Sequence, residues 1–193
     1  MNICVYGAAS SLISDVYKNA GVKLGNKIAE RGNSLVFGGG ANGMMGSVAK
    51  GAYEKGGYIL GIVPSFFREA GTEISFSNCS KYIYTDTVRE RKKEMEDNSD
   101  AFIIAPGGIG TFDEFFEILT LKQLGRHNKA IALFNVNGFY DELEKMMTKY
   151  IEEKFITDDC KQLYKVFTDI DEMLSYVENY DQKDIDLSKV KIR

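Results

Sequence analysis

The segment from Ala101 to Glu117, AFIIAPGGIGTFDEFFE, restricts the possible fold of this chain more than any other segment. The apolar run Phe102 to Ala105 is typical of a buried strand that Pro106 ends, and a glycine-rich loop then leads into an amphipathic helix predicted to begin at Thr111. Glycines leave backbone N–H groups accessible, and a helix N-terminus carries about half a positive charge. The segment therefore predicts an anion site between a strand and a helix, of the kind that binds phosphate.

Glu114 follows this loop in the predicted first turn of the helix. A carboxylate repels a phosphate bound directly against it, so a ligand of both groups must extend beyond its phosphate, as a nucleotide or a sugar phosphate does. The spacing leaves a second interpretation open. Thr111 to Glu114 also fits the S/T-x-x-E capping box, in which the glutamate only returns a hydrogen bond to the backbone of the cap residue.

Strand-like and helix-like segments alternate along the whole chain. This alternation predicts an α/β fold with a doubly wound, mainly parallel sheet, in a Rossmann-like three-layer αβα arrangement. Ligands on such sheets bind outside the carboxyl ends of the strands. Besides the central strand, we expect strands at Ile3 to Tyr6, Leu35 to Phe37, Tyr58 to Val63, Tyr82 to Thr85, Ala130 to Phe134 and Tyr164 to Phe167.

Two further loops of small residues follow predicted strands. Gly7 to Ser11 allows close approach of a ligand or forms a tight turn before a helix. Gly38 to Gly43 satisfies G-x-G-x-x-G, but the acidic residue expected about 20 positions later is missing, so we interpret it as a nucleotide-approach loop rather than an NAD site. The alternative is that small residues at Gly40, Gly43 and Gly46 only allow the next helix to pack.

The segment from Phe66 to Lys81 is predicted to be an irregular loop. Its aromatic residues Phe66 and Phe67 either cover a base or contact a partner subunit. The charged segment from Val88 to Met95 is predicted to be a helix.

Helical spacing places Arg91 between Val88 and Met95 on one face, where an arginine needs an acidic partner or an anionic ligand. Lys92 and Lys93 are expected on the solvated face.

The composition suits one globular domain, because the chain has 193 residues, of which 44% are hydrophobic and 27% charged. We assign residues 1–180 to this domain and 181–193 to a charged tail that is either mobile or an arm on another subunit.

A net charge of -4 argues against nucleic-acid binding, and no apolar run approaches the roughly 20 residues of a membrane span. The three cysteines lack metal or redox spacing, which fits the cytoplasm. The single histidine, His127, lies in a polar stretch and builds neither a triad nor a metal site.

The motif PGGIGTFDE resembles the PGGxGTxxE signature of the LOG family, the cytokinin-activating phosphoribohydrolases often labelled lysine decarboxylases. The resemblance continues through CVYGAAS, RGNSLVFGGGANGMMG, RERKKEM and QLGRHNKAIALFNVNGFYDEL, nearly the whole chain. It implies hydrolysis of a purine nucleoside 5'-monophosphate, AMP or a cytokinin riboside 5'-monophosphate, to free base and ribose 5-phosphate. It also implies a homodimer or larger homo-oligomer that requires no metal and no cofactor.

The resemblance assigns the catalytic roles to Arg91 and Glu114. Glu117, one turn after Glu114 on the same face, is a possible helper, whereas Asp113 is expected to point elsewhere. Departures from common family residues at Ala8, Leu121 and Arg89 leave the preferred base open. A pyridoxal-phosphate decarboxylase is not supported by any lysine in an apolar, glycine-flanked setting, whereas a non-catalytic nucleotide or molybdenum-cofactor carrier is the main alternative. The residues expected to contact substrate are Gly7, Ala8, Gly38, Gly39, Gly40, Gly43, Met45, Lys92, Pro106, Gly107, Gly108, Ile109, Gly110, Thr111 and Glu117.

Overall fold

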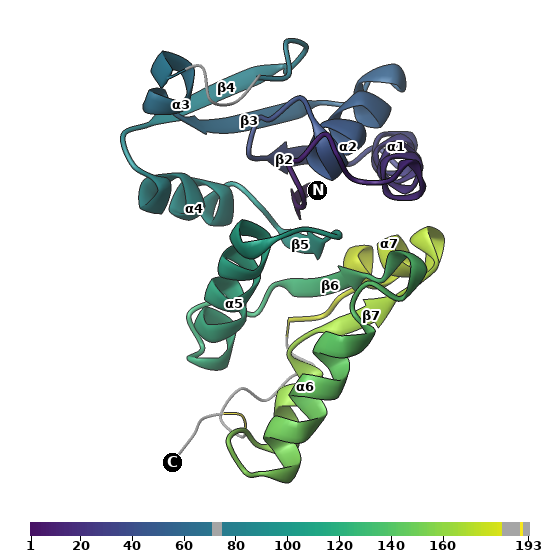
Figure 1. Ribbon diagram of the computed structural model, residues 1–193, viewed down its shortest axis with the longest axis vertical. Helices are drawn as coiled ribbons and strands as arrows, with labels where there is room; N and C mark the ends of the chain where they lie inside the picture. The colour runs from purple at the N-terminus through teal and green to yellow at the C-terminus, as the bar shows by residue number, and fades with distance from the viewer. Residues whose placement is uncertain (71–74, 183–189, 191–193) are drawn as a thin grey trace.

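The computed structural model describes residues 1–70, 75–182 and 190 of the chain. Within these residues, seven strands form one parallel sheet in the order β4-β3-β2-β1-β5-β6-β7 (Figure 1). This order reverses direction at β1, so β1 and β5 lie at the centre. The strands are β1 (Asn2–Tyr6), β2 (Ser34–Phe37), β3 (Ile59–Pro64), β4 (Lys81–Thr85), β5 (Ala101–Ile104), β6 (Ala130–Phe134) and β7 (Lys165–Phe167).

Helices cover both faces of the sheet, which confirms the predicted three-layer α/β fold. One face carries α1 (Asp15–Glu30), α2 (Gly43–Glu54) and α7 (Ile170–Glu178), and the other carries α4 (Val88–Asp97), α5 (Ile109–Gln123) and α6 (Asp141–Glu152). Among the described residues, no helix is long and apolar enough to cross a membrane. The remaining short helices are α3 (Ser65–Ala70), η1 (Val136–Gly138) and η2 (Asp158–Gln162).

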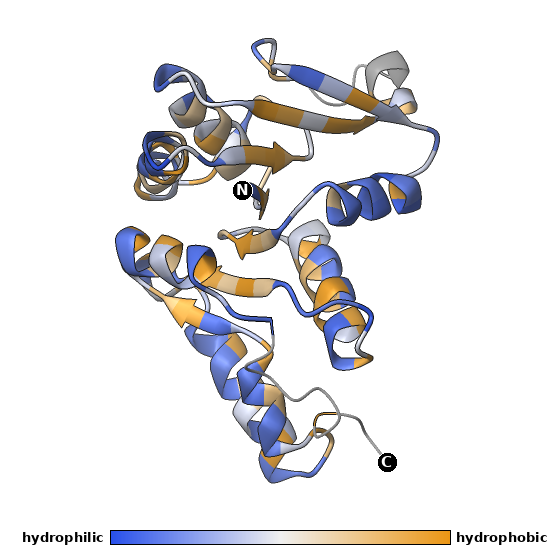
Figure 2. Ribbon diagram, turned by 180° about the vertical axis from the view of Figure 1, so that it is seen from behind, coloured by the Kyte–Doolittle hydropathy of each residue, from blue (hydrophilic) through white to orange (hydrophobic). Residues whose placement is uncertain are grey.

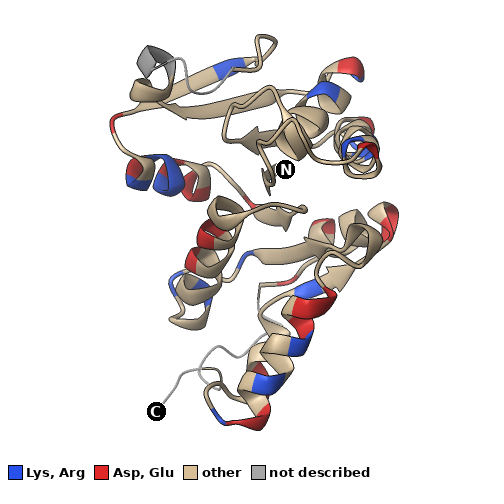
Figure 3. Ribbon diagram, in the orientation of Figure 1, with Lys and Arg blue, Asp and Glu red and all other residues tan. Residues whose placement is uncertain are grey.

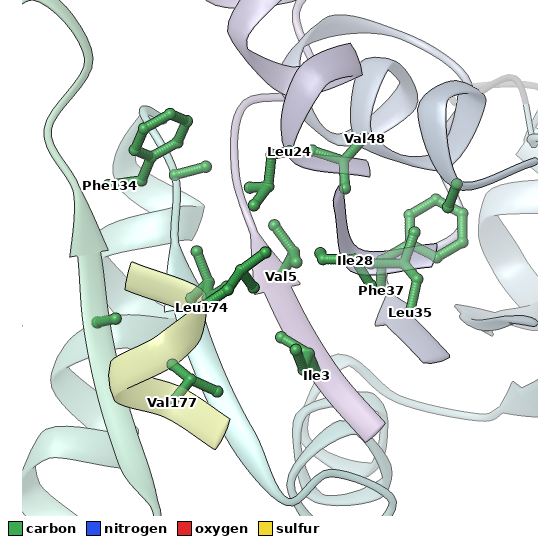
Figure 4. Packing of buried hydrophobic residues seen from close by; sticks show 14 of the residues in the cluster. Ile3, Val5, Leu24, Ile28, Leu35, Phe37, Val48, Phe134, Leu174 and Val177 are labelled. Carbon is green, nitrogen blue, oxygen red and sulfur yellow. The ribbon is translucent and has the colours of Figure 1, made fainter. Parts of the chain in front are cut away.

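Alternate residues of each strand supply two separate hydrophobic cores. In β1, Ile3 and Val5 face α1 and α7, where they pack with Leu24 and Leu174 (Figure 4), whereas Cys4 and Tyr6 face α4, α5 and α6. The central strands are therefore apolar on both faces and mostly orange in Figure 2, while α4 is mostly blue. These two cores hold the carboxyl ends of the central strands in fixed positions.

The segment that follows β3 differs from the irregular loop predicted for it. Helix α3 begins at Ser65, directly after β3, and further along the chain Ser75 forms an isolated antiparallel bridge with Gly40. Phe76 then packs edge-on against Phe37. Six residues of helix are too short to display a hydrophobic period, so the pattern of the sequence could not reveal α3.

Most of the predicted charged tail lies outside the described residues, at 183–189 and 191–193. Val190 is buried in the core beneath α5 and α6, where its carbonyl oxygen accepts a hydrogen bond from Gln123 Nε2 at 3.3 Å. This point of the C-terminal segment therefore packs against its own chain.

Candidate active site

A cleft of about 310 Å³ opens at the carboxyl ends of the central strands. Its walls come from the loop after β1, the first turns of α2, α3 and α5, and one side chain of α4. The loop and the first turns follow strands β1, β2, β3 and β5, and α4 follows β4, so the five strands behind the cleft are consecutive in the sheet. The lining residues are Gly7, Ala8, Ala9, Ser10, Met45, Phe67, Arg91, Gly108, Gly110, Thr111 and Glu114.

The three glycine-rich loops touch one another through their backbones. The N–H of Ala8 donates to the carbonyl oxygen of Pro106 at 3.0 Å, and the N–H of Met45 donates to the carbonyl oxygen of Ala8 at 3.1 Å. Gly43 has a φ of +66°, and a Cβ there would lie 2.4 Å from the Ala8 oxygen. A Cβ at Gly46 would lie 2.1 Å from the carbonyl oxygen of Ala41. Packing within the protein therefore explains why glycine is needed at Gly43 and Gly46. This is the alternative that the sequence left open for these two residues.

Helix α5 begins at Ile109, two residues before the predicted start, with Gly108 as its N-cap. The predicted helix start at Thr111 is therefore two residues late, and the open interpretation in which Thr111 caps the helix is wrong. The Thr111 side chain is buried against Gly107, where a Cβ would lie 2.1 Å from Thr111 Oγ1. Since Gly108, Gly110 and Thr111 line the cleft, the first turn of α5 borders it, and the first N–H groups of a helix have no partner within that helix. This end of the cleft is suited to an anion.

Glu114 pairs with Arg91 rather than with its own helix start. Arg91 Nη2 donates to Glu114 Oε1 at 2.6 Å, and the two side chains are only 13% and 9% exposed. The capping-box interpretation of Glu114 is therefore wrong. A capping box does occur in α4, where Thr87 and Glu90 exchange hydrogen bonds and fix the helix that presents Arg91. The inward orientation predicted for Arg91 is confirmed.

Burial dominates the electrostatics of this pair. Desolvation raises the pKa of Glu114 to about 7, and the neighbouring guanidinium of Arg91 opposes that rise. Arg91 Nε is also buried and has no hydrogen-bond partner among the described residues, which leaves one donor unused. Gly38 leaves room for this arrangement, because a Cβ there would lie 3.1 Å from Met45 Sδ and 3.4 Å from Arg91 Nη1.

Lys92, the neighbour of Arg91, forms a separate ionic cluster. Its Nζ lies 3.0 Å from Asp113 Oδ2 and 2.5 Å from Glu117 Oε2, and none of these three residues lines the cleft. Figure 3 shows that both α4 and α5 carry charged residues. The prediction that Lys92 is solvated is wrong, because its side chain is mostly buried, whereas Lys93 is exposed as predicted. Glu117 pairs with Lys92 and not with Glu114.

The cleft gathers some of the predicted contact residues and leaves others outside. Three lining residues were not among those predicted, namely Ala9, Ser10 and Phe67, of which Phe67 had an open role as base cover or partner contact. The predicted residues that line it are Gly7, Ala8, Met45, Arg91, Gly108, Gly110, Thr111 and Glu114. Those outside its lining are Gly38, Gly39, Gly40, Gly43, Lys92, Pro106, Gly107, Ile109 and Glu117.

His127 lies outside the cleft, in the loop between α5 and β6. Its Nε2 donates to the carbonyl oxygen of Ile118 at 2.9 Å, and burial lowers the pKa of the imidazole to about 4. Over residues 1–70, 75–182 and 190, no three His, Cys, Asp or Glu side chains come together as a metal site.

Comparison with known proteins places this chain among enzymes of one family. A family model described as possible lysine decarboxylase matches residues 45–177. The chain is 36% identical to the cytokinin riboside 5'-monophosphate phosphoribohydrolase LOG2 of Arabidopsis thaliana, over 92% of this chain and 83% of that protein. It is 38% identical to the probable phosphoribohydrolase LOGL1 of Oryza sativa subsp. japonica, over 92% and 79%.

Solved structures share the fold at lower identity. The molybdenum cofactor carrier protein of Chlamydomonas reinhardtii superposes with a TM-score of 0.68 at 24% identity, over 92% of this chain and 95% of that chain. The molybdenum cofactor binding protein of Rippkaea orientalis gives a TM-score of 0.65 at 18% identity, over 92% and 93%. These likenesses establish a common architecture only. The extent and level of its identity to the plant proteins show that this chain belongs to the LOG family of phosphoribohydrolase enzymes.

Proposed function

We propose that this protein hydrolyses the N-glycosidic bond of purine nucleoside 5'-monophosphates, releasing the free base and ribose 5-phosphate. The observation that carries this proposal is the position of Glu114, a buried carboxylate paired with Arg91 in the same cleft as the first turn of α5. The chemistry needs an anion site and a carboxylate a short distance apart. One helix supplies both.

The phosphate belongs at the first turn of α5, where backbone N–H groups and the helix dipole favour a negative group. Glu114 lies one turn further along the same helix, so the ribose of a bound nucleotide would lie against its carboxylate. Binding of the phosphate then holds the sugar in place for the reaction. A nucleoside without the phosphate should be a poor substrate.

The bond between C1' and N9 breaks with its electron pair leaving on the base, so positive charge develops at C1' and the ring oxygen. The Glu114 carboxylate stabilises this charge and accepts a proton from the attacking water, whose oxygen bonds to C1'. The departing base takes up one proton in exchange. A pKa near 7 suits a group that must accept and return a proton at neutral pH. Arg91 orients Glu114 and offers its remaining donors to the nucleotide.

A nucleotide or molybdenum-cofactor carrier is the competing function, and product analysis separates the two. Incubation with AMP and with isopentenyladenosine 5'-monophosphate should release base and ribose 5-phosphate in equal amounts on chromatography. Adenosine should release base at least about a hundredfold more slowly, because it lacks the group that binds α5. Recovery of every nucleotide intact after it has bound to the protein would favour the carrier.

We also propose that a second copy of the chain covers an apolar groove beside the cleft. The groove, of about 670 Å³, runs along α5, and Ile109 at its edge is 90% exposed. Exposed apolar surface of this kind is typical of protein interfaces. Lys92, Asp113 and Glu117 place both charge signs along it, which suits a self-complementary two-fold contact.

Light scattering tests the dimer. The parent should have twice the mass of one 21.6 kDa chain, and Ile109→Glu should be monomeric. Phe155→Glu is the matched control, since Phe155 is an exposed apolar residue that does not line the groove. A parent of 21.6 kDa would contradict the proposal.

A further inference from the structure

We propose that Phe67 of α3 stacks against the base of the substrate and thereby makes the enzyme prefer purine over pyrimidine nucleotides. This inference rests on the proposed function, because it takes a nucleoside 5'-monophosphate as the ligand.

The sheet order places Phe67 at the end of the cleft opposite the anion site. The strands that end at the cleft lie in the order β3-β2-β1-β5. Phe67 follows β3, whereas Gly108 to Glu114 follow β5. Neighbouring strands are about 4.8 Å apart, so the strands that lead into these two walls, β3 and β5, are about 14 Å apart across three strand spacings. A nucleotide with its phosphate at α5 and its sugar at Glu114 therefore extends its base toward Phe67.

The chemistry of this end suits a flat, apolar ring. Phe67 is the aromatic residue of the cleft lining, and Met45 adds a polarisable thioether. The Phe67 ring is half-buried and contacts the Phe66 ring, with centroids 4.7 Å apart and planes at 64°. Phe66 thus supports one side of the ring. Aromatic side chains bind bases through their faces, and a two-ring purine offers more area for this contact than a pyrimidine.

Phe66 provides a matched control in the same helix. It is the same residue type at the next position, but it is 41% exposed and does not line the cleft. Substitution of either residue by leucine keeps an apolar side chain and removes the aromatic face. A difference between the two variants therefore reports contact with the ligand rather than loss of a phenylalanine from α3.

Calorimetric titration in a Glu114→Gln background, where the nucleotide is not consumed, tests this assignment with AMP, CMP and ribose 5-phosphate. Phe67→Leu should weaken AMP binding about tenfold and CMP binding less. Ribose 5-phosphate has no base, so its affinity should change by less than about twofold. Phe66→Leu should leave all three affinities near those of the Glu114→Gln protein without a further change. Phe67→Tyr, which keeps the ring, should retain AMP affinity.

Three results would overturn the proposal. These are equal loss of AMP and ribose 5-phosphate affinity in Phe67→Leu, equal effects of Phe66→Leu and Phe67→Leu, or loss of AMP affinity in a folded Phe67→Tyr. Circular dichroism shows whether each variant is folded. If Phe67→Leu is not folded, the AMP affinity of Phe67→Tyr and the AMP-to-CMP affinity ratio of the Glu114→Gln protein test the proposal instead. A parent that binds CMP as tightly as AMP refutes the proposed preference.

The hydrolase proposal is tested separately by base release from the parent. If the parent binds AMP through Phe67 but releases no base, the role of Phe67 stands and the hydrolase proposal fails. If the parent releases base and Phe67→Leu does not weaken AMP binding, the hydrolase proposal stands and the role of Phe67 fails.

Discussion

Arg91 Nη2 lies 2.6 Å from Glu114 Oε1, and this contact joins α4 to α5 in the lining of the cleft. The two side chains approach from helices that flank the central strand β5, so each depends on the other for its orientation. Burial opposes the charge on Glu114, while the guanidinium favours it. The result is a carboxylate that changes protonation near neutral pH.

The pH dependence of catalysis should follow this titration. A group that accepts a proton is active when deprotonated, so kcat/KM for AMP should rise about tenfold per pH unit below 7 and level off above it. Initial rates of base release between pH 5 and pH 9 provide the measurement. A profile that is flat across pH 5 to 7, or that falls above pH 7, would contradict the role of Glu114 as proton acceptor.

Gly43 and Gly56 separate backbone strain from loop packing. Both have left-handed backbone angles, with φ of +66° and +69°, but a Cβ at Gly56 has no atom within 4 Å, whereas one at Gly43 would lie 2.4 Å from the carbonyl oxygen of Ala8. Gly56→Ala should lower the free energy of unfolding by about 1–2 kcal/mol. Gly43→Ala should lower it by at least about 3 kcal/mol, because backbone must also move. Urea unfolding measures both free energies. Equal losses in the two variants would show that the contact between Gly43 and the Ala8 loop does not add to stability.

Lys122 predicts a pH effect on stability. It is fully buried, its Nζ donates to Tyr180 Oη and to the carbonyl oxygen of Lys129, both at 2.8 Å, and burial lowers its pKa from 10.5 to about 7. Between these values the unfolded chain binds more protons than the folded chain, so stability should rise with pH from 7 to 10. The slope from this residue is at most about 1.4 kcal/mol per pH unit.

Lys122→Met should flatten that slope when urea unfolding is repeated across the same pH range. Lys23→Met is the matched control, because Lys23 is exposed and should leave the slope unchanged. Identical slopes in the parent and Lys122→Met would mean that Lys122 keeps an ordinary pKa in the folded protein.

Features that depend on one strand and the loop after it could be predicted from the sequence. The three glycine-rich loops follow strands that are neighbours in the sheet, so the parallel order alone brings Gly7, Met45 and Gly108 to one cleft. The inward face of α4 could also be predicted, because Met95 is one turn from Arg91 and is buried.

Features set by contacts between helices could not be predicted. The sequence around Lys92 does not reveal that Asp113 and Glu117 lie opposite it, because that pairing depends on how α4 packs beside α5. The capping box at Thr111 failed for a local reason, since the glycine at 108 starts the helix earlier and leaves Glu114 beyond the cap. Phe67 needed α3, which is too short to show a period.

The most direct test of the account compares Glu114→Gln with Glu117→Gln in one assay of base release from AMP. The two residues lie on the same helix, one turn apart, but Glu114 lines the cleft and Glu117 pairs with Lys92 outside it. We predict that Glu114→Gln lowers kcat at least about a hundredfold, while Glu117→Gln stays within about threefold of the parent because it removes only a partly exposed ion pair. Parent-like base release by Glu114→Gln would contradict the assignment of the reaction to this carboxylate.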